Sequence, residues 1–74
     1  MEENKFIEDF ATIFDDTEAS ELTMETEFKN LDEWGSLVAL GLLAVMDEEY
    51  DAELSSKDIE RSNTIRDIYN IVKG

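Results

Sequence analysis

The sequence predicts an all-α fold, a small bundle of four helices with a long loop between helices one and two and a short third helix. Two patterns favour this fold. Apolar residues recur at the i, i+3, i+4, i+7 spacing of a helix face, and no segment shows the alternation of a half-buried strand. The chain contains no proline that would interrupt a helix. Its 74 residues are enough for a single domain, residues 1–74, with one small core.

The first helix is expected to run from about Glu3 to Asp15. Its apolar face carries three phenylalanines and two isoleucines, which we interpret as core residues: Phe6, Ile7, Phe10, Ile13 and Phe14. The long connection follows, from Asp16 to Gly35. Twenty residues are unusual for a loop in a compact domain, but five apolar residues are spread along it: Leu22, Met24, Phe28, Leu31 and Trp34. We therefore expect the loop to be anchored on the bundle.

The second helix is predicted from Ser36 to Tyr50, with the Ser36 hydroxyl as a candidate N-cap. Five residues form the expected inward stripe: Leu37, Leu40, Leu43, Ala44 and Met46. Val38, Leu42 and Val45 widen the apolar surface beyond it. Glycine disfavours a helix interior, so Gly41 is expected to let a neighbouring segment approach closely.

The third helix is short and is predicted from Ser56 to Arg61, with Ser55 or Ser56 as its N-cap. The fourth begins at a sequence that resembles a capping box, Thr64 to Asp67, with aspartate in place of the usual glutamate. Its apolar stripe consists of Ile65, Ile68, Tyr69 and Val72.

Acidic residues dominate the composition, with 20 against 6 basic ones and a net charge of −14. This charge repels nucleic acid and anionic membrane surfaces and attracts basic protein partners. In the alternative interpretation, it serves solubility alone. The longest apolar run, Leu37 to Met46, is too short to span a membrane, and residues 1–4 lack the basic segment of a signal peptide. We expect a cytoplasmic monomer.

Enzymatic chemistry is disfavoured by the residues that are missing. The chain has no histidine and no cysteine, so neither a Ser-His-Asp arrangement nor a nucleophilic thiol can be built. The acidic run from Asp47 to Asp51 lacks the glycine of a calcium-binding loop. We therefore predict no enzyme activity, no catalytic residue and no built metal site.

Ser36 remains the main candidate for chemistry. Backbone N–H groups and the helix dipole at a helix N-terminus stabilise a negative charge, so a serine there is well placed to carry a phosphodiester. Taken alone, however, a serine at this position is interpreted first as a simple N-cap.

The whole chain, from Phe6 to Val72, resembles the acyl carrier protein family. Ser36 and Leu37 match the end of that family's Asp-Ser-Leu motif, in which the serine receives phosphopantetheine, and Leu31-Asp32 precedes it as in many members. Three downstream segments look like the family's helix two end, helix three and helix four start: Met46 to Asp51, Asp58 to Glu60, and Asn63 to Ile65. The predicted bundle is thus acyl-carrier-protein-like.

The resemblance implies a 4'-phosphopantetheine arm attached at Ser36, next to Gly35 and Leu37, that carries an acyl or aminoacyl thioester. The implied partners are a phosphopantetheinyl transferase and acyl- or aminoacyl-transferring enzymes with basic docking patches. Six residues are the candidate docking surface: Asp32, Glu33, Val38, Asp47, Glu48 and Glu49.

Two departures from the family pattern keep other functions open. Gly35 replaces the aspartate that assists transfer to the serine, and Val38 and Gly41 stand where acids are common. The chain is alternatively an unmodified, carrier-like module for protein interaction or regulation. A third possibility is an unrelated acidic helical protein, such as a nucleic-acid mimic or inhibitor.

Overall fold

The computed structural model describes residues 3–73, and this part of the chain is all helical, with no strand. It contains four α-helices and two short 3-10 helices: α1 (Glu3–Ala11), η1 (Ala19–Glu21), η2 (Phe28–Asn30), α2 (Ser36–Tyr50), α3 (Ser56–Arg61) and α4 (Ile65–Lys73). The radius of gyration is 10.8 Å, close to the roughly 11 Å of a compact domain of this length. The predicted all-α bundle of four helices, with a long first loop and a short third helix, is confirmed.

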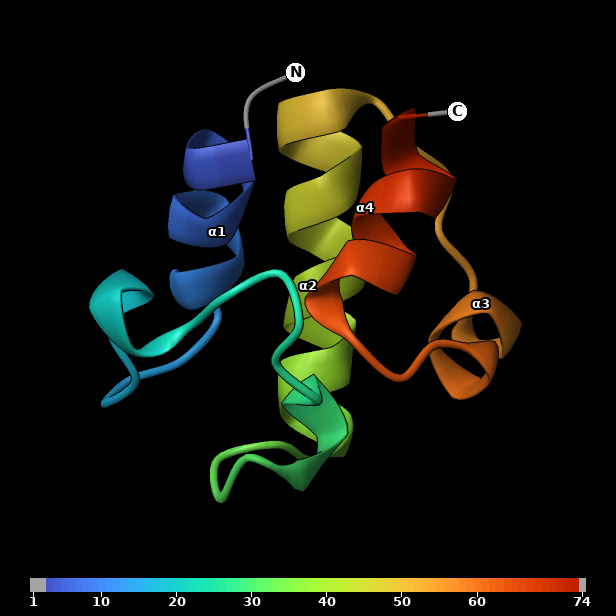
Figure 1. Ribbon diagram of the computed structural model, residues 1–74. Helices are drawn as coiled ribbons and strands as arrows, with labels where there is room; N and C mark the ends of the chain where they lie inside the picture. The colour runs from blue at the N-terminus through green and yellow to red at the C-terminus, as the bar shows by residue number, and fades with distance from the viewer. Residues whose placement is uncertain (1–2, 74) are drawn as a thin grey trace.

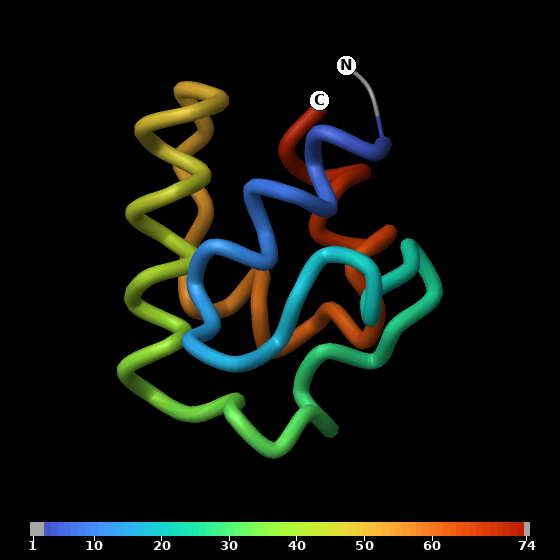
Figure 2. The backbone as a smooth tube through the Cα atoms, turned by 90° about the vertical axis from the view of Figure 1, so that its left-hand side faces the viewer, coloured from blue at the N-terminus to red at the C-terminus, as the bar shows by residue number. Residues whose placement is uncertain are grey.

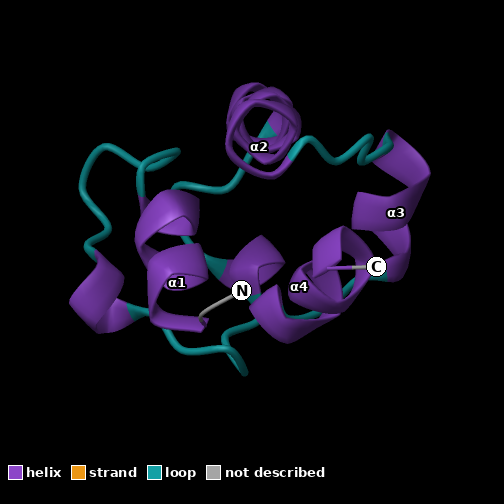
Figure 3. Cartoon of the chain, turned by 90° about the horizontal axis from the view of Figure 1, so that it is seen from above, coloured by secondary structure: helices purple, strands orange, loops and turns teal. Residues whose placement is uncertain are grey.

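Three helices surround the core and the fourth lies beside them. Figure 1 shows α1 running in the opposite direction to α2 and α4, so that Ser36 lies at the end of the bundle far from the start of α1. Seen from above, α1 and α4 lie side by side, α2 packs across them, and α3 lies next to α4 (Figure 3). The short α3 therefore reaches the beginning of α2 from one side.

The core is built mainly from aromatic and branched side chains. Seven large ones are fully buried: Phe6, Phe10, Phe28, Leu42, Met46, Ile65 and Ile68. The Phe6 ring centroid lies 5.1 Å from that of Tyr69 on α4 and 5.5 Å from that of Tyr50 at the end of α2. Each such side chain contributes about 1.5–3 kcal/mol through burial, which explains how so short a chain can fold.

The first helix ends earlier than predicted, at Ala11 instead of Asp15. Beyond it the backbone tightens into i→i−3 hydrogen bonds, such as Phe14 N–H to Ala11 O at 3.1 Å. The Thr12 hydroxyl also donates to the Asp9 carbonyl at 2.6 Å, a local bond with which threonine competes against helix propagation. Phe14 is nevertheless buried, so the predicted apolar face extends past the helix itself.

The loop between α1 and α2 is held on the bundle, as predicted. Leu22, Met24 and Phe28 are buried, and Leu31 and Trp34 pack against the core. Figure 2 shows the loop passing the beginning of α4 before it crosses to the start of α2. There the backbone N–H groups of Arg66 and Ile65 donate to the carbonyls of Met24 and Thr26, at 2.7 and 3.0 Å. The loop thus satisfies N–H groups that a helix start leaves without intrahelical partners.

The caps of α3 and α4 form as the sequence indicates. Of the two candidate serines, Ser55 is the N-cap of α3 and forms a reciprocal capping box with Asp58. At α4, the Thr64 hydroxyl accepts from the Asp67 N–H at 3.3 Å, and the Asp67 carboxylate accepts from the Thr64 N–H at 3.0 Å. The capping box with aspartate is therefore confirmed.

The inward stripe predicted for α2 is right for Met46 and partly right for the half-buried Leu43, but it is wrong for its other three residues. Leu37 and Leu40 are 81% and 62% exposed and Ala44 is also exposed, whereas Leu42 and Met46 are fully buried. The helix is apolar around most of its circumference, so hydrophobic periodicity does not identify the buried face.

Gly41 does not serve a close approach, contrary to the sequence-based expectation. A Cβ atom there would meet Ile13 at 3.8 Å, an ordinary van der Waals contact. Gly41→Ala should therefore raise the free energy of unfolding by about 0.5–1 kcal/mol, because alanine loses less backbone entropy in a helix. The reverse change at an exposed position of the same helix, Ala44→Gly, should lower it by a similar amount. Urea unfolding followed by circular dichroism measures both, and a destabilised Gly41→Ala variant would refute this packing.

Candidate functional site

Ser36 is the first residue of α2 and lies at its exposed N-terminus. The N-cap position belongs to Gly35, whose carbonyl accepts the first helical hydrogen bond from the Ala39 N–H at 2.9 Å. The prediction that the Ser36 hydroxyl caps the helix is therefore wrong. Within residues 3–73, this hydroxyl has no hydrogen-bond partner. It is sterically available for a covalent group, and the unpaired N–H groups of the first helical turn favour negative charge beside it.

Gly35 places no steric demand on the site. Its φ of −173° is extended backbone that any residue adopts, and a Cβ atom added there would have nothing within 4 Å. The Cβ atom of an aspartate at this position would lie in open space. Its carboxylate would also be a better helix cap than glycine.

A groove of about 460 Å³ lies next to Ser36, between the loop, the start of α2 and α3. We call it the Ser36 groove. Trp34, Ala39 and Ile59 provide apolar wall, and polar groups come from Lys29 and Glu60 at its border. The Trp34 ring is fixed by an edge contact with the buried Phe28, with ring centroids 4.9 Å apart. The groove volume falls in the range of small-ligand sites.

Lys29 joins the loop to the end of α3. Its ammonium group donates to the carbonyl oxygens of Ile59 and Glu60, at 3.1 and 3.0 Å. These carbonyls belong to the last turn of the helix, where the Ile59 carbonyl also accepts from the Ser62 N–H at 3.1 Å. Lys29 therefore ties the α3 wall of the Ser36 groove to the loop, in addition to the packing of Ile59 in the core.

The outer face of α2 carries an apolar ridge, which we define as Leu37, Leu40 and Ala44. Because the helix repeats every 3.6 residues, these side chains share one face with Glu48. All four residues are exposed. The ridge thus begins beside Ser36 and leads to the acidic end of the helix.

Four of the six predicted docking residues are exposed to solvent, and the other two contact the rest of the protein. Asp32, Asp47, Glu48 and Glu49 are exposed, whereas Val38 is only half-buried and turns partly toward the core. Glu33 is engaged within the loop. Its carboxylate accepts hydrogen bonds from the Thr17 hydroxyl at 2.7 Å and from the backbone N–H groups of Thr17 and Asp16, both at 2.9 Å. Hydrogen bonds from Thr17 and from the Asp16 backbone hold the pKa of Glu33 below its usual value.

The acids at the C-terminal end of α2 interact unfavourably with the helix dipole. The last turn contains no basic residue, although negative charge near a helix C-terminus is unfavourable by about 0.3–1 kcal/mol per group. Partial relief comes from α1, since the Lys5 ammonium lies 3.7 Å from the Glu49 carboxylate. Nothing comparable neutralises Asp47 or Glu48 in the described part of the chain.

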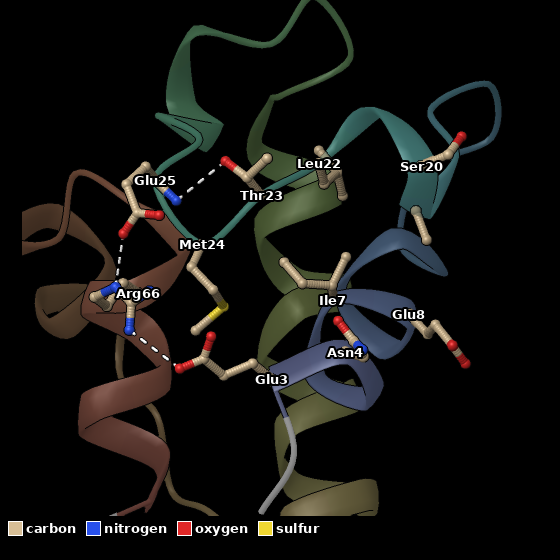
Figure 4. A pocket seen from close by; sticks show the side chains of 11 residues that line it. Glu3, Asn4, Ile7, Glu8, Ser20, Leu22, Thr23, Met24, Glu25 and Arg66 are labelled. Carbon is tan, nitrogen blue, oxygen red and sulfur yellow. Dashed lines mark hydrogen bonds and ion pairs between the residues drawn. The ribbon is translucent and has the colours of Figure 1, made fainter.

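A second cavity, of about 520 Å³, lies between α1, the loop and the start of α4 (Figure 4). Ile7, Leu22 and Met24 provide its apolar lining. The Arg66 guanidinium borders it and forms ion pairs with Glu25 at 2.7 Å and Glu3 at 3.2 Å. Because that charge is already paired on two sides, the cavity presents no free cation to a ligand.

Lys29, Trp34 and Leu40 are the site residues that sequence reasoning did not select. Lys29 and Trp34 come from the loop, and their position depends on its path over α3. Leu40 was assigned to the core. No local pattern distinguishes these roles, although Trp34 lies only two residues before Ser36.

Within the described residues, no three His, Cys, Asp or Glu side chains are arranged to hold a metal ion. No helix of the same range has the length and apolar character needed to cross a membrane. No protein-family model matches the chain, and no solved structure is significantly similar to it.

Proposed function

We propose that the protein is an acyl carrier protein, which carries an acyl or aminoacyl thioester on a 4'-phosphopantetheine arm attached at Ser36. The observation that carries the proposal is the Ser36 hydroxyl itself, which is exposed at the first position of a 15-residue helix and has no hydrogen-bond partner among residues 3–73. The Ser36 groove beside this hydroxyl offers space for the arm. The arm supplies the thiol that a chain without cysteine lacks.

In the proposed attachment, coenzyme A donates the phosphopantetheinyl group to Ser36. The Ser36 oxygen attacks the phosphorus that bears pantetheine, the P–O bond of the pyrophosphate breaks, and adenosine 3',5'-bisphosphate leaves. The hydroxyl proton passes to a base of the phosphopantetheinyl transferase. The product is a phosphodiester with one negative charge at the N-terminus of α2, where the helix dipole favours it.

The α2 ridge and its acidic end are the proposed docking surface for partner enzymes. Exposed leucines on a helix favour an apolar recess on the partner, and Asp47 and Glu48 favour basic residues around that recess. These acids lie at a helix end where they reduce stability, which supports a role in binding. Such electrostatic docking is fast, so the carrier can visit several enzymes in turn.

In this proposal the protein is a cytoplasmic monomer that performs no catalysis of its own. A second candidate is supported by Gly35, which replaces the aspartate that assists transfer. An unmodified, carrier-like module would use the same acidic surface for protein interaction or regulation.

Intact-protein mass separates the two candidates. The chain is incubated with coenzyme A, magnesium and a broad-specificity phosphopantetheinyl transferase, beside the Ser36→Ala and Gly35→Asp variants. The carrier predicts a gain of one phosphopantetheinyl group in the parent and none in Ser36→Ala. Gly35→Asp should react at least as fast, because its side chain has free space. A gain in Gly35→Asp but none in the parent would favour the interaction module.

A further inference from the structure

Lys29 provides the one cationic side chain among the described residues that line the Ser36 groove. The ion pairs of the described chain involve Lys5 and Arg66, and none includes Lys29. Its ammonium instead contacts two carbonyl oxygens, those of Ile59 and Glu60. Because no carboxylate pairs with Lys29 in the described chain, its positive charge is available to an anion bound in the groove.

A phosphodiester on Ser36 would compete with these carbonyls for the ammonium. It carries a full negative charge, whereas a backbone carbonyl oxygen carries only the partial charge of a neutral dipole, so the Coulombic attraction of the ammonium to the phosphodiester is the stronger one. Both Lys29 and Ser36 line the same groove, and the lysine stem is flexible over four carbons. Glu60 also borders the groove, and its carboxylate repels the phosphate. A nearby cation is required to offset this repulsion.

We propose that Lys29 is a positioning residue for the arm: on modification of Ser36, its ammonium leaves the Ile59 and Glu60 carbonyls and binds the phosphodiester. This inference rests on the proposed function. The exchange orients the first part of the arm along the Ser36 groove and removes the two bonds that tie the last turn of α3 to the loop. The short α3 is then tied to the bundle mainly through Ile59, which is buried. Partner enzymes would therefore encounter a looser α3 on the modified carrier than on the unmodified one.

Amide hydrogen exchange reports the state of α3. The backbone N–H groups of Ile59 and Ser62 donate to the Ser55 and Ile59 carbonyls at 3.2 and 3.1 Å, so their exchange follows opening of this helix. We expect exchange at both amides to become about tenfold faster when Ser36 is modified. In Lys29→Met, exchange should already be fast and should not change on modification. Lys29→Arg should restore the response, and Lys57→Met, which removes an exposed lysine of α3 outside the groove, should behave as the parent.

A second experiment, with a synthetic adduct in place of phosphopantetheine, tests the same inference without the transferase. The chain contains no cysteine, so Ser36→Cys can be alkylated selectively with a thiol-reactive alkyl phosphonate or, as a neutral control, with iodoacetamide. Faster exchange in α3 is expected with the phosphonate only, and only where residue 29 is a cation. Equal exchange with both adducts, or an unchanged response in the double variant with Lys29→Met, would overturn the role of Lys29. The mass measurement on the unaltered serine decides the proposed function separately.

Discussion

Leu42→Ala should lower the free energy of unfolding by about 2–5 kcal/mol, whereas Leu40→Ala, two positions earlier, should change it by less than about 0.5 kcal/mol. Leu42 is fully buried, and its truncation leaves a cavity among side chains that cannot close around it. Leu40 is 62% exposed, and its replacement removes little packing. A domain of this size has only about 4–11 kcal/mol of stability in total, so the first variant is expected to unfold readily.

Urea unfolding of the two variants, followed by circular dichroism at 222 nm, measures this difference. The pair tests which face of α2 packs on α1 and α4, because the substitution is chemically identical at both positions. If the two variants lost similar stability, α2 would be rotated relative to the structure. The side chains of the α2 ridge would then face the core instead of solvent, and the docking proposal would be refuted.

The parts of the fold that sequence reasoning predicts well are those set by local interactions. Ser55 with Asp58 and Thr64 with Asp67 define the starts of α3 and α4 through bonds between residues three apart. Such caps depend on nearby residues only, so the sequence contains all that they require. The apolar stripe of α4 is similarly clear, because the remaining positions of the helix are polar except for the exposed Ile71.

Prediction fails where the answer depends on distant segments. Along α2 nearly every residue before Asp47 is apolar, and only the positions of α1 and α4 decide that Leu42 faces inward. The early end of α1 reflects a competing bond from the Thr12 hydroxyl, which helix periodicity does not register. At the candidate site, the place of Ser36 at the start of α2 follows from the sequence. The contact of Lys29 with α3 does not, since about thirty residues separate the two.

Phe28→Ala should lower the free energy of unfolding by about 3–5 kcal/mol, as much as the loss of a helix core residue. Phe28 lies in the loop, yet it is fully buried. Its ring makes edge contacts with Phe10 of α1 and with Trp34, at centroid distances of 5.5 and 4.9 Å. An ordinary flexible connection would tolerate this substitution, so the size of the loss measures how firmly the loop belongs to the bundle.

Two signals followed in the same urea titration distinguish loss of the loop from loss of the whole fold. Fluorescence of Trp34, the one tryptophan of the chain, reports the loop, and circular dichroism reports the helices. In the parent chain the two transitions should coincide, because Phe28 couples loop and core. In Phe28→Ala, the Trp34 transition should move to lower urea than the helix transition. Coincident, unshifted transitions in the variant would mean that Phe28 does not anchor the loop, and the Ser36 groove would lose the support that holds its Trp34 wall.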